Sequence, residues 1–124
     1  LYAAPAYLER HGRPATVADL ADAVFVGAGE LDRYVANVRD LGLPITRANL
    51  KYASDSGLMA WEMVKRGLGM TLMWRGVGDL TPEVEQILPE VEPVPVPIWL
   101  VTHRELRTSP RIRLVFDLLA QAIA

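Results

Sequence analysis

The sequence predicts an α/β fold with a mainly parallel sheet. Amphipathic helical segments alternate along the 124 residues with short runs rich in β-branched and aromatic residues. Apolar residues make up 51% of the chain, so a core can form, and the length suits one domain or one lobe of a larger protein. The clearest stretch is residues 52–74, where a strand end, a polar turn, an amphipathic helix and a second strand follow one another as in a βαβ unit.

Capping and turn residues divide the first half of the chain into five elements. Pro5 opens the first helix, and Thr16 with Asp19 resembles a capping box that opens the second, although aspartate replaces the usual glutamate or glutamine. Gly42 and Pro44 end the third helix. The predicted elements are helix 6–11, helix 17–23, strand 24–26, helix 31–41 and strand 45–53.

The second half continues this alternation. Glu62, Lys65 and Arg66 share one face of a segment whose other face is apolar, which predicts a helix over 58–68 with one buried side. Gly67 and Gly69 are placed to end it. The remaining predicted elements are strand 70–73, loop 75–79, a short helix capped by Thr81 with Pro82 first, an extended connector over 91–97, strand 98–102 and a last helix that opens at Ser109 and Pro110.

The candidate binding site is the turn that holds Ser54, Asp55 and Ser56. Backbone N–H groups at the start of a helix have no partner within the helix, and the helix dipole is positive there. Such a turn therefore suits a carboxylate or a phosphate. The alternative is that these three residues only cap their own helix, and the βαβ unit taken alone favours that alternative.

Ligands of parallel α/β sheets bind where the strands end at their carboxyl termini. In this chain those ends are residues 27–29, 53–56 and 74–76. Trp74 follows one of these strands and precedes a glycine loop, so it either packs on the domain or lines a cleft. Arg75 stands at the same strand end, where an anion could arrive.

Composition excludes several classes of protein. The chain has no cysteine, which excludes disulfides and thiol chemistry and agrees with a cytoplasmic protein. The net charge of −2 provides no general attraction to nucleic acid or to an anionic membrane. No stretch has the length and apolar purity of a membrane span, and no signal peptide is visible.

The motifs of catalysis and of cofactor binding are missing as well. The sequence Gly27-Ala28-Gly29 lacks the third glycine of a dinucleotide fingerprint, because Asp32 stands in its place. No serine lies in a nucleophile-elbow pattern, and no cluster has metal-ligand spacing. His11 and His103 each lie beside an arginine in a polar context, which is typical of surface histidines. We therefore predict no catalytic residue, no metal and no cofactor.

Four stretches together resemble the effector-binding domain of LysR-type transcriptional regulators. They are, in chain order, A-P-A-Y-L-E-R-H-G-R-P-A-T-V-A-D-L over 4–20, S-D-S-G-L-M-A-W-E-M-V-K-R-G-L-G-M over 54–70, L-P-E-V-E-P-V-P-V-P-I-W-L-V over 88–101, and S-P-R-I-R-L-V-F-D-L-L over 109–119. Their order and spacing extend over nearly the whole chain.

The resemblance implies one lobe of a fold like that of type 2 periplasmic binding proteins. Residues 1–97 would be the second lobe, and residues 98–124 the return crossing strand and the closing helix. The first lobe and the helix-turn-helix domain would be absent, so this chain alone is expected not to bind DNA. In the family the effector contacts the start of the helix that here follows Ser54, Asp55 and Ser56. To these we add Trp74, where the family often has proline.

Two other functions, and one interface, are also considered. A solute-binding protein of a transport system would have the same lobe but an exported chain, and a small α/β enzyme would need a catalytic constellation that the sequence lacks.

In the closing helix, a broad apolar stripe predicts self-association as a homo-oligomer. The residues expected at that interface are Ile112, Val115, Phe116 and Leu119.

Overall fold

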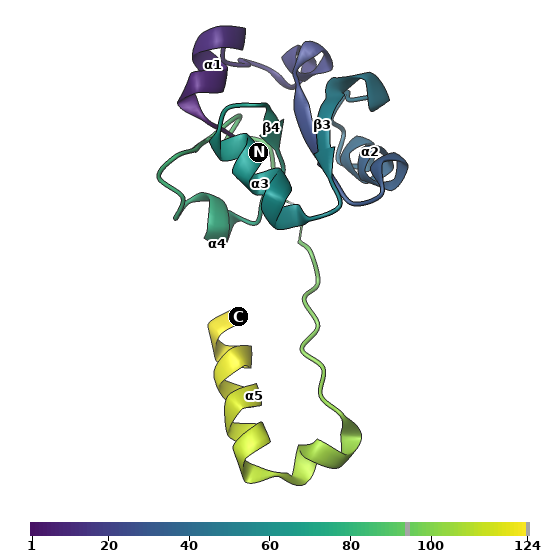
Figure 1. Ribbon diagram of the computed structural model, residues 1–124, viewed down its shortest axis with the longest axis vertical. Coiled ribbons are helices and arrows are strands. Elements are labelled where there is room, and N and C mark those ends of the chain that lie inside the picture. The colour runs from purple at the N-terminus through teal and green to yellow at the C-terminus, as the bar shows by residue number, and fades with distance from the viewer. Residues whose placement is uncertain (94, 124) are drawn as a thin grey trace. The chain divides into compact units, whose positions relative to one another are not determined.

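The structure is a computed structural model that describes residues 1–93 and 95–123. The chain divides into two compact units, Leu1–Glu92 and Pro93–Ala124. The first unit contains all the strands among the described residues, and the second contains the last helix (Figure 1).

The first unit is built on a five-stranded mixed sheet with the strand order β3-β2-β4-β1-β5. Strand β2 pairs in parallel with β3 on one side and with β4 on the other. Strand β1 pairs antiparallel with both β4 and β5. The strands are β1 (Tyr2–Ala3), β2 (Phe25–Ala28), β3 (Leu50–Ser54), β4 (Met70–Thr71) and β5 (Glu85–Gln86).

Along the chain, the helices of this unit alternate with the strands, as the sequence predicts for an α/β fold. The elements are α1 (Pro5–His11), the 3-10 helices η1 (Val17–Asp22) and η2 (Arg47–Asn49), α2 (Leu31–Asp40), α3 (Gly57–Lys65) and α4 (Arg75–Gly78). The predicted capping box at η1 is confirmed, because the Asp19 carboxylate accepts hydrogen bonds from the backbone N–H groups of Ala15 at 2.9 Å and Thr16 at 2.8 Å. These bonds also hold the pKa of Asp19 below its usual value.

Successive residues of the strands point to opposite faces of the sheet and so divide the core into two clusters. Ala3 and Phe25 lie in the larger cluster, which is covered by α1, η1 and α2. Tyr2 and Val26 lie in the smaller one, which is covered by α3. The sheet is thus sandwiched between helices, in the layered arrangement of an α/β domain.

The strand predicted over 45–53 is wrong in its first half, where the chain forms η2. Asn49 is buried, and its side-chain amide donates to the carbonyl oxygens of Ala21 at 2.7 Å and Ala23 at 3.0 Å. Its Oδ1 accepts from the Thr46 backbone N–H at 2.7 Å, which closes a capping box. This network holds a turn where a segment of mixed polarity was predicted as a strand.

The region after β4 also differs from the prediction. Residues 75–78, predicted as loop, form α4, and the strand predicted over 70–73 pairs only at Met70–Thr71. The helix predicted after Thr81 is wrong, because Glu85–Gln86 pair with Tyr2–Ala3 as β5 and Ile87 is fully buried. Strand pairing with β1 outweighs the local helix signals of Thr81 and Pro82.

The second unit contains η3 (Arg104–Thr108) and α5 (Pro110–Ile123). The predicted last helix is confirmed. The predicted strand over 98–102 is not formed, since these residues pair with no strand of the described chain and Trp99 is 83% exposed. The connector predicted over 91–97 includes residue 94, which lies outside the described residues.

None of the helices in the described part of the chain combines the length and the apolar character that crossing a membrane requires.

Candidate functional site

The candidate site lies where two neighbouring parallel strands end. Ala28 at the end of β2 pairs with Ser54 at the end of β3, and the next residue, Gly29, donates its N–H to the Ser54 carbonyl at 3.0 Å. The backbone of Gly29 has φ +69, in the left-handed region that favours glycine. Two of the three predicted strand ends are therefore tied together at one edge of the sheet, as expected for a parallel α/β fold.

Of the three predicted residues in the turn before α3, Ser56 alone caps the helix. The Ser56 backbone N–H donates to Ser54 Oγ at 3.1 Å, and the Met59 N–H donates to Ser56 Oγ at 3.4 Å. Ser56 is the N-cap residue, and Asp55 is exposed. The N–H groups of the first two helical residues, Gly57 and Leu58, have no acceptor within the helix. The first turn of α3 thus presents free donors beside hydroxyl groups.

The neighbouring helix α2 begins differently, because the carboxylate of its own N-cap residue binds the first N–H groups. The carboxylate of Glu30 accepts from the backbone N–H groups of Arg33 at 2.8 Å and Asp32 at 3.1 Å. These two bonds hold the pKa of Glu30 below its usual value. The N-terminus of α2 is closed by this carboxylate, whereas α3 has only a serine hydroxyl at its start. Glutamate is not a preferred N-cap residue, so the sequence did not indicate this cap.

Trp74 is the residue before α4, and its side chain is 56% exposed. Its carbonyl oxygen accepts from the N–H groups of Val77 and Gly78, both at 2.9 Å. Since β4 is parallel to β2, α4, which Trp74 precedes, and the start of α3 lie toward the same edge of the sheet (Figure 1). Within the described residues, no hydrogen bond joins Trp74 to Ser54, Asp55 or Ser56.

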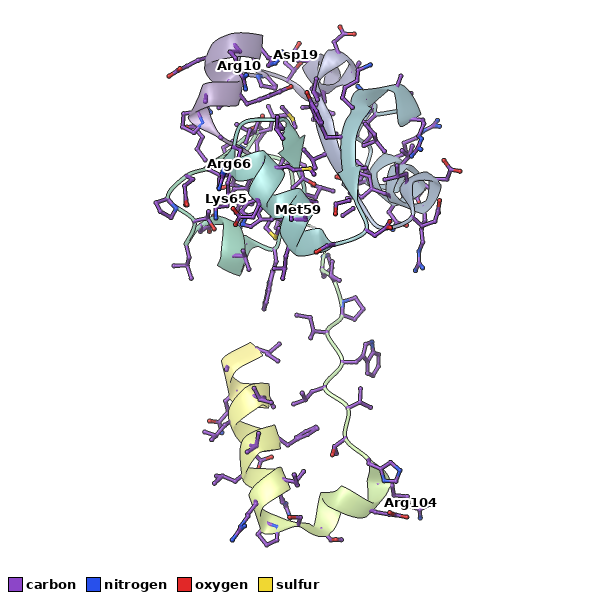
Figure 2. All side chains as sticks on the ribbon, viewed as in Figure 1. Arg10, Asp19, Met59, Lys65, Arg66 and Arg104 are labelled. Atoms are coloured by element: carbon purple, nitrogen blue, oxygen red, sulfur yellow. The ribbon has the colours of Figure 1, made fainter. Side chains whose placement is uncertain are left out.

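Two apolar side chains of the first turn of α3 are also exposed. Leu58 is 82% exposed, and Met59, labelled in Figure 2, is 53% exposed. Together with Trp74 they place apolar surface at the edge where the free N–H groups lie. An anion that also carries an apolar group would match this combination.

A hollow of about 180 Å³ lies at the other edge of the parallel strands. It is lined by Ala23, just before β2, and by Met70, the first residue of β4. His11 also lines it, stacked on the ring of Tyr7 with a centroid distance of 4.6 Å. This hollow therefore does not coincide with the candidate turn. His11 and His103 are both exposed, as predicted for surface histidines.

The described residues contain no group of three or more His, Cys, Asp or Glu side chains arranged to hold a metal ion.

Comparison with known protein families gives one match. Residues 1–124 match the family model of the LysR substrate binding domain, which covers the whole chain. The chain belongs to this family. The comparisons with curated proteins and with solved structures found no match.

Membership in the LysR substrate binding domain family confirms the predicted resemblance and the predicted α/β fold. The sheet is mixed and not mainly parallel as predicted, because β1 pairs antiparallel with β4 and β5. The five-stranded mixed sheet with helices on both faces is a lobe of the type 2 periplasmic-binding-protein kind. LysR effector domains sense small molecules for a regulator and are not enzymes, so this domain is an effector-sensing domain without catalytic activity. The match favours a regulator over the transport and enzyme alternatives.

Proposed function

We propose that this chain is one lobe of the effector domain of a bacterial, cytoplasmic LysR regulator and that it binds a small anionic effector at the turn Ser54-Asp55-Ser56. The observation that supports this most is the contrast between the two helices at the same edge. The N-terminus of α2 is occupied by Glu30, whereas the first N–H groups of α3 have no side-chain acceptor. Trp74 provides an apolar contact for the same ligand.

The mechanism is a change in population between open and closed lobes. An effector that contacts both lobes binds the closed form more tightly and shifts the equilibrium toward it. In the full-length protein this closure repositions a helix-turn-helix domain, which makes the contacts with DNA. The 124-residue chain has a net charge of −2 and is expected not to bind DNA by itself. Residues 1–97 form the second lobe in this proposal, and residues 98–124 the return segment and closing helix.

A pair of substitutions at one residue tests the binding turn. Proline at Gly57 removes one free N–H donor, and proline is well tolerated at the first position of a helix. The preceding residue, Ser56, already has the extended conformation that proline requires, with φ −91 and ψ 115. In the full-length protein we expect Gly57→Pro to weaken binding of an anionic effector by about tenfold, the value of one hydrogen bond to a charged group.

The matched control is Gly57→Ala, which keeps the N–H donor. An added Cβ at this position meets nothing within 4 Å, so the alanine variant should fold and bind like the original protein. Affinities are measured by isothermal titration with succinate, glutamate, citrate and benzoate. If Gly57→Pro binds the active carboxylate as tightly as Gly57→Ala, the effector does not use this turn.

We also propose that α5 is covered by a second copy of this chain. Val115 and Leu119 are 53% and 45% exposed, and Ile112 and Phe116 are half-buried on the same face. None of the described residues of α5 is buried. A helix face with this much apolar surface is rarely left in contact with water.

Sedimentation velocity at increasing concentration tests this interface. The 124-residue chain should show a concentration-dependent dimer, and Leu119→Glu should make it monomeric, because a charge would be buried in the contact. Gln121→Glu is the control, since it adds the same charge on the opposite face of α5. A monomer at every concentration of the unmodified chain contradicts the proposed dimer.

A further inference from the structure

Tyr2 lies at the point where the two elements of the candidate site meet. It is 2% exposed, and its ring packs edge-on against Trp61 of α3, with the centroids 6.2 Å apart and the planes at 87°. Its hydroxyl donates to Asp79 Oδ1 at 2.6 Å, just beyond the end of α4. Burial, together with this bond to the carboxylate, raises the pKa of Tyr2 to about 12, so the hydroxyl remains a donor at neutral pH.

The turn from Trp74 to Asp79 is one hydrogen-bonded unit. The carbonyl of Trp74 accepts from Val77 and Gly78, and the Asp79 N–H donates to the Arg75 carbonyl at 2.9 Å. A displacement of Asp79 therefore moves the backbone of Trp74 as well. The neighbouring residue Met73 packs into the same cluster as Tyr2.

Gly78 brings the backbone of α4 directly against Tyr2. A Cβ added at Gly78 would overlap three atoms of the Tyr2 ring. The glycine thus allows a close contact between backbone and ring that any side chain would prevent. The same ring packs on Trp61 of α3, so Tyr2 contacts both helices whose starts carry the candidate site.

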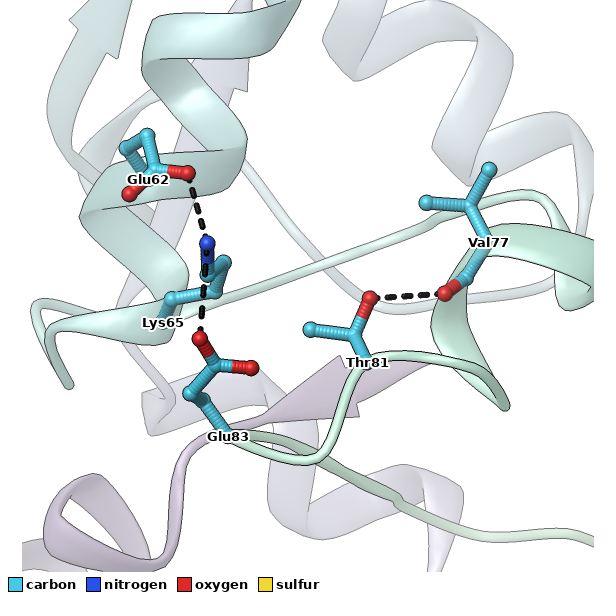
Figure 3. Close-up of polar contacts among 5 residues, drawn as sticks. All are labelled: Glu62, Lys65, Val77, Thr81 and Glu83. Atoms are coloured by element: carbon cyan, nitrogen blue, oxygen red, sulfur yellow. Dashed lines mark hydrogen bonds and ion pairs between the residues drawn. The ribbon is translucent and has the colours of Figure 1, made fainter.

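A second link holds the segment after α4 to α3. Figure 3 shows Lys65 of α3 between Glu62, at 2.6 Å, and Glu83, at 3.6 Å. The same figure shows Thr81 donating through Oγ1 to the Val77 carbonyl at 2.7 Å. These contacts are partly exposed and so contribute little individually. The packing of Tyr2 on Trp61 and Gly78, by contrast, is buried.

We propose that Tyr2 is a positioning residue that, through its hydrogen bond to Asp79 and its packing on Gly78 and Trp61, fixes Trp74 relative to the start of α3. The effector site then has an apolar wall at a set position before the ligand arrives, which lowers the entropic cost of binding. Trp74 as an effector contact rests on the proposed function, but its placement by Tyr2 does not. Loss of the Tyr2 hydroxyl leaves the fold intact and frees Trp74 to move.

The test follows Trp74 directly, in the 124-residue chain and without ligand. With 5-fluorotryptophan, the chain gives one fluorine resonance for each of Trp61, Trp74 and Trp99, assigned by single substitutions to phenylalanine. Tyr2→Phe keeps the ring and removes the hydroxyl. It should shift or broaden the Trp74 resonance and increase quenching of Trp74 fluorescence by acrylamide, measured with Trp61 and Trp99 replaced by phenylalanine.

Tyr34→Phe is the matched control, because it removes the hydroxyl of a half-buried tyrosine, which is bonded to Thr71 Oγ1 at 2.9 Å. It should lower the stability comparably but leave the Trp74 resonance in place. Two variants of the acceptor complete the test. Asp79→Asn retains an oxygen acceptor and should preserve the Trp74 resonance, whereas Asp79→Ala should reproduce the effect of Tyr2→Phe.

Two results would overturn the proposal. The first is an unchanged Trp74 resonance in both Tyr2→Phe and Asp79→Ala. The second is an equal shift in the Tyr34→Phe control, which would indicate general loosening of the domain. Because no ligand is present, neither result depends on whether the turn at Ser54 binds an effector. A failure of the anion-binding test at Gly57 is therefore distinguishable from a failure here.

Discussion

Replacing Gly78 with alanine should lower the free energy of unfolding by about 3 kcal/mol, the upper end of what overpacking costs in a protein core. The added Cβ would overlap the Tyr2 ring, which also packs on Trp61 and cannot turn away without breaking the bond to Asp79. Either α4 or the ring must shift. Urea denaturation followed by tryptophan fluorescence measures the loss.

Gly76→Ala is the control within the same short helix. A Cβ at Gly76 meets only the Trp74 ring, at 3.9 Å, which is ordinary van der Waals contact. Alanine also has a higher helix propensity than glycine, so this variant should be neutral or slightly more stable. Equal stabilities for the Gly76 and Gly78 variants would show that the contact between α4 and Tyr2 is not close.

Gly69→Ala is expected to have the second largest effect, about 2–3 kcal/mol of destabilisation. A Cβ at Gly69 would lie 2.8 Å from the carbonyl oxygen of Val24 and 3.2 Å from Val26 Cγ2. That carbonyl accepts the Met70 N–H at 2.9 Å and so begins the pairing of β2 with β4. Because the obstacle is backbone, the two central strands would have to separate.

Gly57→Ala makes the same chemical change where space is open, and its stability should stay within about 1 kcal/mol of the original. Thermal denaturation of the two variants side by side gives the comparison. If Gly69→Ala unfolds at the same temperature as Gly57→Ala, β2 and β4 are not as closely packed at Gly69 as the structure shows.

Local chemistry explains which parts of the fold were predictable from the sequence. The start of α3 at Ser56, the capping box of Thr16 with Asp19 and the end of α3 at Gly67 depend on interactions within a few residues. Gly67 has φ +74, a conformation that glycine adopts at no steric cost. These three signals are present in the sequence itself, and the predictions based on them are confirmed.

Elements that depend on distant partners were predicted poorly. Strand β5 exists because Glu85–Gln86 pair with Tyr2–Ala3 from the start of the chain, and no local pattern marks that pairing. The same holds for α4. It packs on Tyr2, whose hydroxyl donates to Asp79 at the end of this helix, 77 positions further along the chain. Conversely, residues 98–102 have strong β propensity but no partner strand among the described residues, and a strand requires one to satisfy its backbone.

The candidate site was partly predictable for the same reason. Ser54 and Ser56 belong to a turn whose local sequence favours capping. Ser56 is the N-cap residue, whereas Ser54 accepts the Ser56 N–H. No local pattern indicated that Glu30 closes the neighbouring helix or that the Tyr2 hydroxyl donates to Asp79 after α4. Both depend on side chains whose roles are set by the folded arrangement. The assignment of Ser54, Asp55, Ser56 and Trp74 to an effector stays a prediction.

The most direct measurement is a titration of the full-length protein, labelled with ¹⁵N-glycine, with succinate, glutamate, citrate and benzoate. The carboxylate that raises the melting temperature should shift the Gly57 amide resonance saturably, because an oxygen of the ligand accepts that N–H. Gly12, at the end of α1, should stay unchanged. A carboxylate that stabilises the protein but leaves Gly57 in place, or the failure of every carboxylate to stabilise it, would contradict anion sensing at this turn.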